Sequence, residues 1–231
     1  MKTPILNTVD PLTIIGGGDC TVDDISLART IAPRCVAADG GAHIALATRV
    51  PLSAVIGDMD SISDAAKAQI PADIFHHIAE QDSTDFDKAL RHVSTPLAVA
   101  VGFCGGRVDH ALAALHTLVV YRHKRVILLG ENDIIFLCPP HIALPLEAGT
   151  RVSLFPLGAV RGTSTGLKWP INGIEFAPGV RSGTSNQAEG DVTLTVENPQ
   201  MLCILPRRFI QQVASLFVGP KAPAQWPARA E

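Results

Sequence analysis

Three acidic residues are crowded into the stretch that reads IGDMDSISD, residues 56–64. Asp58 and Asp60 flank a single methionine, and Asp64 follows four residues later. Ionised carboxylates held close together repel one another, so a turn that fixes them requires positive charge between them. Mg²⁺ meets this requirement, because it takes oxygen ligands, keeps several waters and binds through a few carboxylates plus substrate phosphates. The stretch therefore predicts a magnesium site.

Further acidic and glycine residues follow the ends of predicted strands. These strand ends carry Gly16-Gly17-Gly18-Asp19, Asp39-Gly40-Gly41 and Gly105-Gly106-Arg107, with Asp109 and His110 just beyond. The segment QDSTDFDK, before a predicted helix, supplies Asp82, Asp85, Asp87 and Lys88. In open α/β sheets the ligand lies beyond the carboxyl ends of the strands, where these residues are expected.

The glycines and two cations add a phosphate-binding component to the predicted metal site. Glycine permits unusual backbone angles and lets N–H groups approach phosphate oxygens. Lys88 and Arg107 can neutralise phosphate charge, and the planar guanidinium of Arg107 can do so with two hydrogen bonds. Carboxylates, glycines and cations together predict a site for a metal-bound nucleoside polyphosphate, in which catalysis is mainly positioning and electrostatic stabilisation.

Several of these residues also have structural interpretations. Asp82 or Ser83 could be the N-cap of the helix that runs through Lys88, and Asp64 could begin the helix DAAKAQI. Lys88 could form only a surface pair with Asp85, three residues earlier. Each of these alternatives would remove a residue from the predicted site.

Asp58 and Asp60 are harder to explain structurally. Alternate residues of an extended stretch point to the same side, and two like charges placed side by side bring no stability. The turn GGG is weak evidence for a ligand by itself, and Asp87 is expected to face solvent. His110 is as consistent with a substrate-pocket residue as with a surface one.

The elements that position these residues alternate along the first part of the chain. Apolar runs predict strands at 12–18, 34–42, 54–58, 96–106 and 125–130, and helical spacing occurs at 23–32, 42–48, 83–93 and 108–123. Continuous apolar strands between helices are typical of a parallel sheet covered on both faces. We therefore expect an α/β fold: a Rossmann-like parallel sheet with helices on both faces.

The pattern changes near residues 136–142. Short β-type runs separated by Gly and Pro follow, with no long helix before about Arg207, so we expect a smaller antiparallel β-sandwich domain. The sequence ends in GPKAPAQWPARAE, which we expect to be a loose tail. The predicted organisation is a catalytic domain over 1–138, a β-rich domain over 139–210 and a tail over 211–231.

Composition excludes several classes of protein. The 231 residues carry a net charge of -3, which gives no electrostatic attraction to nucleic acid or to an anionic membrane. The five cysteines are scattered without CxxC spacing, so reduced thiols in a cytoplasm are expected rather than disulfides or zinc. We see no signal-peptide pattern and no apolar run near the ~18 residues that a membrane span needs.

The order of the motifs adds a resemblance. ADGGAHIAL, VIGDMDSI, QDSTDFDKAL and GGRVDHALAAL occur in this order and closely resemble thiamin pyrophosphokinase. STGLKWPI and GTSNQAEGDVTLTVENPQMLCIL are similar to the thiamin-binding β-domain of that family. The resemblance covers roughly residues 10 to 206. Any one of these motifs is weak evidence, whereas four in register with a matching second domain are strong.

The resemblance implies that the hydroxyl of thiamin attacks the β-phosphorus of ATP, giving thiamin diphosphate and AMP. It implies Mg²⁺ as cofactor, ATP and thiamin as substrates, and a homodimer with the active site between subunits. The metal ligands it implies are Asp39, Asp58, Asp60 and Asp85. The catalytic residues it implies are Asp58, Asp60, Asp85, Lys88, Arg107 and Asp109. The ATP-binding residues are Gly16, Gly17, Asp39, Gly40, Gly41, Ser83, Thr84, Lys88 and Arg107. The thiamin-binding residues are His110, Ser185, Asn186 and Gln187.

The sequence departs from the family pattern at a few positions. His43 stands where Asn is common, and Gln187 stands where an acidic residue is common, so a contact to the cationic substrate could come from Glu189 instead. Cys203 aligns with an aromatic residue that stacks on thiamin in some members, and Trp169 is an alternative aromatic or an interdomain or core residue. The changes at Gln187 and Cys203 leave open a diphosphokinase for another small alcohol such as a pterin. A non-catalytic nucleotide- or thiamin-binding regulator is a further alternative, although the acidic motifs have lost nothing that catalysis needs.

Overall fold

The computed structural model describes residues 4–229, so the outer ends of the predicted catalytic domain and tail, residues 1–3 and 230–231, lie outside the described residues. The chain divides into two compact units. The first runs to Thr117 and includes Val126–Glu131, and the second comprises Leu118–Arg125 and the chain from Asn132 onward. Each unit is described by itself.

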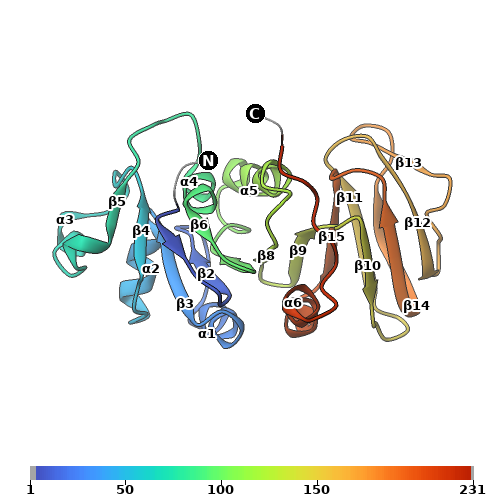
Figure 1. The fold of residues 1–231 in the computed structure, drawn as a ribbon, viewed down its shortest axis with the longest axis horizontal. Coiled ribbons are helices and arrows are strands. Elements are labelled where there is room, and N and C mark those ends of the chain that lie inside the picture. Colours follow the sequence, from blue (N-terminus) through green and yellow to red (C-terminus); the bar gives the residue numbers. More distant parts are fainter. Residues whose placement is uncertain (1–3, 230–231) are drawn as a thin grey trace. The chain divides into compact units, whose positions relative to one another are not determined.

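The first unit is built on a parallel sheet with the strand order β8-β7-β2-β3-β4-β5 (Figure 1). Its strands are β2 (Leu12–Ile15), β3 (Arg34–Ala38), β4 (Ala54–Gly57), β5 (Phe75–His77), β7 (Ala98–Val101) and β8 (Val126–Leu129). Every residue of β2, β4, β7 and β8 is buried. Burial at consecutive positions means that both faces of the sheet are covered, as the continuous apolar runs predict.

Helices lie between these strands in the sequence, and three of them pack on the sheet. They are α1 (Val22–Ile31), α2 (Gly41–Ala47), α3 (Asp64–Lys67), α4 (Asp85–His92) and α5 (Val108–Val120), with the 3₁₀ turn η1 (Ala72–Ile74) before β5. Helix α1 packs on β2 and β7, α2 on β2 and β3, and α4 on β3 and β4. A separate short parallel pair is formed by β1 (Leu6–Asn7) and β6 (Val93–Ser94).

The helix starts follow local side-chain chemistry. Thr21 and Asp24 form a reciprocal capping box at the start of α1. Helix α3 begins at Asp64 behind the cap of Ser63, which confirms the structural interpretation of Asp64. Helix α4 is capped by Thr84, whose hydroxyl oxygen accepts from the N–H of Asp87. The expectation that Asp82 or Ser83 caps this helix is therefore wrong, because the chain turns into the helix one residue later.

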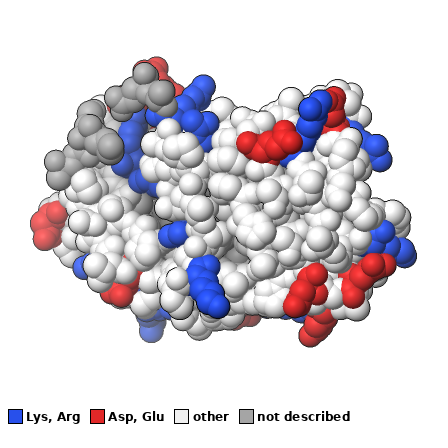
Figure 2. All heavy atoms as spheres, turned by 45° about the vertical axis from the view of Figure 1, so that its right-hand side comes forward, with Lys and Arg blue, Asp and Glu red and all other residues white. Residues whose placement is uncertain are grey.

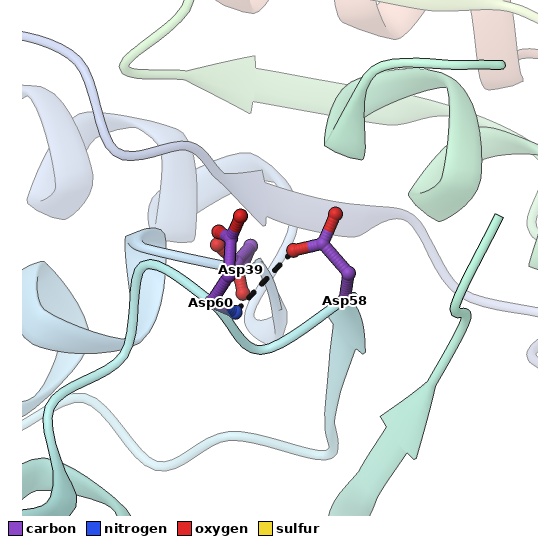
Figure 3. Close-up of side chains that lie close together, drawn as sticks. All are labelled: Asp39, Asp58 and Asp60. Carbon is purple, nitrogen blue, oxygen red and sulfur yellow. Dashed lines mark hydrogen bonds between the residues drawn. The ribbon is translucent and has the colours of Figure 1, made fainter. Parts of the chain in front are cut away.

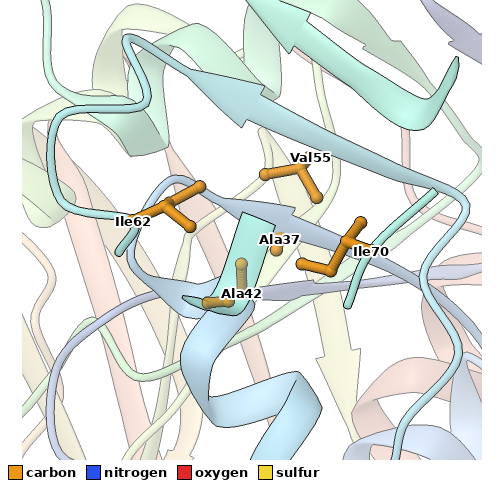
Figure 4. Close-up of a cluster of buried hydrophobic side chains, with 6 residues drawn as sticks. Ala37, Ala42, Val55, Ile62 and Ile70 are labelled. Carbon is orange, nitrogen blue, oxygen red and sulfur yellow. The ribbon is translucent and has the colours of Figure 1, made fainter. Parts of the chain in front are cut away.

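A small apolar cluster fixes the loops that follow β3 and β4. It contains Ala37, Ala42, Val55, Ile62, Ala66 and Ile70 (Figure 4). The small side chains of Ala37 and Ala42 let α2 lie close to the sheet, and burying the larger members contributes roughly 1.5–3 kcal/mol each. Ile62 anchors the far end of the acidic stretch, so the turn between β4 and α3 has little freedom.

The second unit is antiparallel. Its strands are β9 (Asp133–Leu137), β10 (His141–Leu144), β11 (Arg151–Pro156), β12 (Val160–Leu167), β13 (Glu175–Phe176), β14 (Gly183–Val196) and β15 (Met201–Pro206). Strand β14 pairs with β11 over its first part and with β10 and β12 over its last part. It therefore joins two groups of antiparallel strands, and the alternation of buried and exposed residues along β12 is typical of strands with one covered face.

The end of the chain is more ordered than its composition predicts. The turn η2 (Arg207–Phe209) leads into α6 (Ile210–Val218), as expected for a helix after about Arg207. Beyond it, the indole N–H of Trp226 donates to the carbonyl of Cys138 at 2.9 Å. Arg122 and Arg125 donate to the carbonyls of Pro227 and Pro223, each at 3.0 Å. The expectation of a loose tail is wrong for residues 219–229. Prolines lack N–H donors, but their carbonyls accept from Arg122 and Arg125, and the tail's own Trp226 donates to Cys138.

Charges of both signs are interspersed on the face drawn in Figure 2, among wide uncharged areas. This agrees with the small net charge of -3. Among residues 4–229, no helix combines the length and apolar character required to cross a bilayer.

Candidate metal and phosphate site

Asp39 and Asp58 directly follow neighbouring strands, β3 and β4. The strands are parallel, with Ala38 opposite Ile56, so both acids emerge at the same edge of the sheet. A Cβ on Gly57 would lie 2.6 Å from the Cβ of Asp39, so only glycine leaves room there for the acid. Asp39 has φ of +40°, a left-handed conformation that Asp tolerates better than most residues.

A tight turn brings Asp60 to the other two acids. Met59 has φ of +64°, so the stretch is not extended, and the reason given for Asp58 and Asp60 pointing to one side is wrong. The turn is held by the N–H of Asp60, which donates to Oδ1 of Asp58 at 3.3 Å. The N–H and hydroxyl of Ser61 donate to Asp39 Oδ2 and Asp60 Oδ1 at 3.2 and 2.9 Å.

The three acids form one group of oxygen donors. One carboxylate oxygen from each of Asp39, Asp58 and Asp60 lies within 4.8 Å of the other two (Figure 3). Asp39 is 1% exposed, and its Oδ1 is buried without a hydrogen-bond partner among the described residues. A buried carboxylate oxygen without a partner is costly, and a cation would remove that cost. Donor chemistry, spacing and this unpartnered oxygen all fit a hard divalent ion such as Mg²⁺.

Lys88 supplies positive charge beside this group. It is 1% exposed, and its Nζ lies 2.8 Å from Asp58 Oδ2 and 3.4 Å from Asp85 Oδ1. The alternative of a surface pair with Asp85 is therefore wrong. The hydrogen bond from Lys88 lowers the pKa of Asp58 to about 2, against the opposing effect of burial. Burial lowers the pKa of Lys88, but its bonds and charge interactions with Asp58 and Asp85 outweigh burial and raise it.

Asp85 lies next to the three-oxygen group without belonging to it. It occupies the first turn of α4, and burial raises its pKa, as do the negative charges of Asp39 and Asp58. A cation at the site would relieve this repulsion. The structure thus gathers the four predicted metal residues and Lys88 at one edge of the sheet.

The segment before α4 contains contacts that sequence reasoning missed. The Gln81 amide donates to Asp58 Oδ2 at 3.0 Å. Glu80 accepts from Ser83 and Arg91, so the hydroxyl of Ser83 is engaged within the segment while Thr84 caps the helix. Gln81 is the first residue of the motif QDSTDFDK and Glu80 directly precedes it, so their place beside the acids was the available signal.

The predicted glycines divide into two kinds. Gly16 is buried, its N–H donates to the carbonyl of Val101 at 2.8 Å, and a Cβ there would meet the Phe103 ring at 2.6 Å. A Cβ on Gly41 would lie 2.0 Å from the carbonyl oxygen of Ile15. Packing therefore explains these two glycines. Gly17 is exposed, and Gly40 is half-buried at the N-cap of α2.

Arg107 directly precedes α5, Asp109 and His110 lie in its first turn, and all three are exposed. Two hydrogen bonds, of 3.1 and 2.6 Å, join the Arg107 guanidinium to the Asp109 carboxylate. This pairing lowers the pKa of Asp109. Within residues 4–229, no described hydrogen bond or ion pair connects the three residues to the acidic group.

In the second unit, the predicted thiamin residues lie on β14. Ser185 is exposed with φ of +62°, and Gln187 is half-buried. Asn186 is 7% exposed, and its side-chain oxygen accepts from the N–H groups of Trp169 and Gln187 at 3.2 and 2.8 Å. Its amide nitrogen donates to the Trp169 carbonyl at 2.7 Å.

The structure also shows the surroundings of Trp169 and Cys203, the two positions considered for stacking on thiamin. Trp169 is 55% exposed, with Lys168 Nζ 4.9 Å from its ring centroid, so it is not a core residue. Cys203 is fully buried in β15, and burial raises the pKa of its thiol well above the usual value. Cys203 therefore does not present a surface on which a ring could stack.

Two family profiles match the chain in order. The thiamin pyrophosphokinase catalytic domain matches residues 29–129, and the thiamin pyrophosphokinase vitamin B1 binding domain matches residues 141–201. Thiamine pyrophosphokinase 2 of Arabidopsis thaliana is 32% identical over 162 residues, covering 62% of this chain and 60% of the relative. Thiamine pyrophosphokinase 3 of Oryza sativa subsp. japonica is 29% identical over 158 residues, covering 60% of this chain and 59% of the relative. The chain thus spans about three fifths of the length of these curated relatives.

Solved structures share the fold. Thiamin pyrophosphokinase from Candida albicans has a TM-score of 0.72 at 18% identity, covering 89% of this chain and 95% of that one. Thiamine pyrophosphokinase from Bacillus subtilis has a TM-score of 0.69 at 23% identity, covering 85% and 98%. The two profiles together match more than half of the sequence. The chain belongs to the thiamin pyrophosphokinase family.

Proposed function

We propose that this protein transfers an intact diphosphate from ATP to the hydroxyl of thiamin. The hydroxyl oxygen bonds to the β-phosphorus, the bond from that phosphorus to the α,β-bridging oxygen breaks, and the hydroxyl proton is lost. The products are thiamin diphosphate and AMP. The observation that carries the proposal is the unpartnered Oδ1 of Asp39 within a group of three carboxylates beside a buried lysine.

Asp39, Asp58 and Asp60 would hold Mg²⁺, with Asp85 beside them, directly or through water. When bound, the ion supplies positive charge that neutralises the phosphates. Lys88 holds Asp58 ionised and in place, and its charge lies where phosphate oxygens would approach. ATP binding itself, including any contact with Gly17, Gly40 or Thr84, belongs to this proposal.

Arg107 and Asp109 would act at the mouth of the site. Their mutual pair is exposed, so it costs little to break, and a guanidinium released from Asp109 can bind a phosphate with two hydrogen bonds. His110, Ser185 and Gln187 would contribute to thiamin binding. Asn186 would contribute by holding the backbone of Trp169.

The assembly is also part of the proposal. We infer a homodimer whose active sites lie between subunits from the family resemblance, and a cytoplasmic location from the scattered cysteines. Sedimentation of the purified protein tests the dimer, and a monomer that turns over at the same rate per chain would contradict a shared site.

The test of the reaction is to incubate the protein with ATP, Mg²⁺ and thiamin and to separate the nucleotides. We expect AMP and thiamin diphosphate in equal amounts, and no reaction when a chelator removes the metal. Release of ADP would contradict diphosphate transfer. Thiamin competing poorly against a pterin or another alcohol would assign the site a different acceptor.

A further inference from the structure

Asp58 is contacted differently on its two carboxylate oxygens. Oδ2 accepts from Lys88 Nζ at 2.8 Å and from the Gln81 amide at 3.0 Å. Among residues 4–229, the one hydrogen bond that Oδ1 accepts is longer, 3.3 Å, and comes from the N–H of Asp60. Figure 3 shows this second oxygen on the side of Asp39 and Asp60. The carboxylate therefore has a side occupied by protein donors and a side left for the metal.

Two donors on one oxygen fix the orientation of a carboxylate better than one. A carboxylate oxygen has about two lone-pair sites, so Lys88 and Gln81 together fill those of Oδ2. Lysine alone is a point charge on a flexible stem, around which the carboxylate can rotate. The Gln81 amide approaches from a second direction and opposes that rotation. Partners of this kind typically change metal affinity by about 10–100-fold.

Glu80 explains why Gln81 is held at this place. The Glu80 carboxylate accepts from the N–H groups of Asp82 and Ser83 at 2.9 and 3.2 Å, and from the Ser83 hydroxyl. It also pairs with Arg91, in the last turn of α4. These contacts fold the segment between β5 and α4 around Glu80, so the adjacent Gln81 is delivered to Asp58.

We infer that Gln81 is a positioning residue that sets the affinity of the acidic group for its divalent cation by fixing the Asp58 carboxylate, and that Glu80 holds Gln81 in place. The inference rests on the proposed function, since it takes the acidic group to be the metal site. It adds a residue that contacts a metal ligand rather than the metal.

The test measures Mn²⁺ binding to the purified full-length protein without nucleotide, by titration calorimetry. Gln81→Met removes the donor while keeping the length of the side chain, and Gln81→Ala removes both. We expect the Kd for Mn²⁺ to rise about tenfold in both variants, with the melting temperature of the metal-free protein unchanged. Glu80→Gln should raise the Kd for Mn²⁺ less, because glutamine keeps one side-chain oxygen that can accept from the segment's donors. The control is Gln69→Ala, which removes an amide that donates only to the Ala65 carbonyl.

Activity gives a second readout. The Mg²⁺ concentration for half-maximal rate should rise about tenfold in Gln81→Met, and kcat should return to within twofold of the wild-type value at saturating Mg²⁺. A wild-type protein that binds no Mn²⁺ would overturn the metal site and this inference with it. Wild-type binding with unchanged affinity in both Gln81 variants would overturn this inference alone. Weaker binding explained by a lower melting temperature would also overturn it, because the role would then be structural.

Discussion

The acidic group of the first unit and the Ser185–Gln187 segment of the second carry the two most specific motifs of the sequence, yet their hydrogen bonding differs. Asp39 keeps a buried oxygen without a partner among the described residues, and Asp58 keeps one oxygen with only a long bond. Asn186 instead uses its side-chain oxygen twice and its nitrogen once, all within its own unit.

The difference distinguishes carboxylates with unused hydrogen-bonding capacity, which we propose to bind a cation, from a side chain whose hydrogen bonds are all made within the fold. Both kinds occur in motifs, because a ligand site needs side chains that bind and side chains that keep them in place. A buried polar atom without a hydrogen-bond partner distinguishes the side chains that bind, since native structures rarely leave such atoms unpaired without a reason. The experiments below test this distinction.

The largest effect is expected from Asp60→Asn and Asp58→Asn. Removing a negative metal ligand should lower kcat and kcat/KM together, by several orders of magnitude, because the lost interaction is strongest in the transition state. Steady-state kinetics at saturating Mg²⁺ measures this loss. Asp60 is the cleaner position, since it is exposed, whereas Asp58→Asn also leaves Lys88 without its closest charge partner.

Asp73→Asn is the matched control, because Asp73 is an exposed acid of the same unit in η1. It should turn over normally. Near-normal turnover in Asp60→Asn would remove Asp60 from the metal site and leave its carboxylate as a partner of Ser61 only.

The second largest effect is expected at Gly41. An alanine there would place its Cβ 2.0 Å from the Ile15 carbonyl oxygen, which can be relieved only by moving α2 away from β2. We expect Gly41→Ala to destabilise the protein by about 3 kcal/mol. Denaturant unfolding measures the loss. Gly17→Ala, whose Cβ would meet Gly40 at an ordinary 3.4 Å, should cost less than about 1 kcal/mol. Equal stability of the two variants would contradict the packing role of Gly41.

Sequence reasoning reached the mixed α/β class, the parallel sheet of the first unit and the edge of that sheet that carries the acids. Continuous apolar runs such as Val55-Ile56 and Val99-Ala100, alternating with helical segments, are typical of strands in a parallel sheet covered on both faces, so local sequence sufficed for this prediction. The placement of Asp39 beside Asp58 followed from the same logic, because the carboxyl ends of neighbouring parallel strands share one edge.

What sequence reasoning could not reach depends on the path of loops. Met59 adopts a left-handed backbone conformation, which is not predicted for methionine, and the resulting turn brings Asp60 close to Asp39. The contact of Gln81 with Asp58 joins residues 23 positions apart and exists only because Glu80 folds its segment. Trp226 finds its acceptor 88 residues away, which a proline-rich composition cannot indicate.

Asn186 gives the next test of the comparison. Asn186→Ala would leave the N–H groups of Trp169 and Gln187 and the carbonyl of Trp169 without their partner. We expect a loss of about 2 kcal/mol in the free energy of unfolding, because three hydrogen bonds of a buried side chain would be lost. Gln187→Ala, whose amide makes only a 3.4 Å bond to the Gly149 carbonyl, should stay within about 0.5 kcal/mol. A stable Asn186→Ala protein with lost thiamin affinity would show that Asn186 contacts the substrate instead.

The smallest effect on stability is expected at Glu80, an acid of the first unit whose carboxylate accepts several hydrogen bonds from the protein. Bonds from Ser83, with those from Arg91 and Asp82, lower the pKa of Glu80 from 4.5 to about 2. The unfolded state therefore binds a proton more readily than the folded state between these values, so stability from Glu80 is present above pH 4.5 and is lost as pH falls toward 2. Glu80→Gln should be less stable than wild type by under about 1 kcal/mol near pH 7, since solvent screens the exposed part of the pair. Measured by denaturant unfolding, this difference should vanish as pH approaches 2, and Asp73→Asn should show no such convergence. A difference that persists at pH 2 would mean that the ionised carboxylate of Glu80 does not hold the segment. Another interaction would then have to place Gln81 beside Asp58.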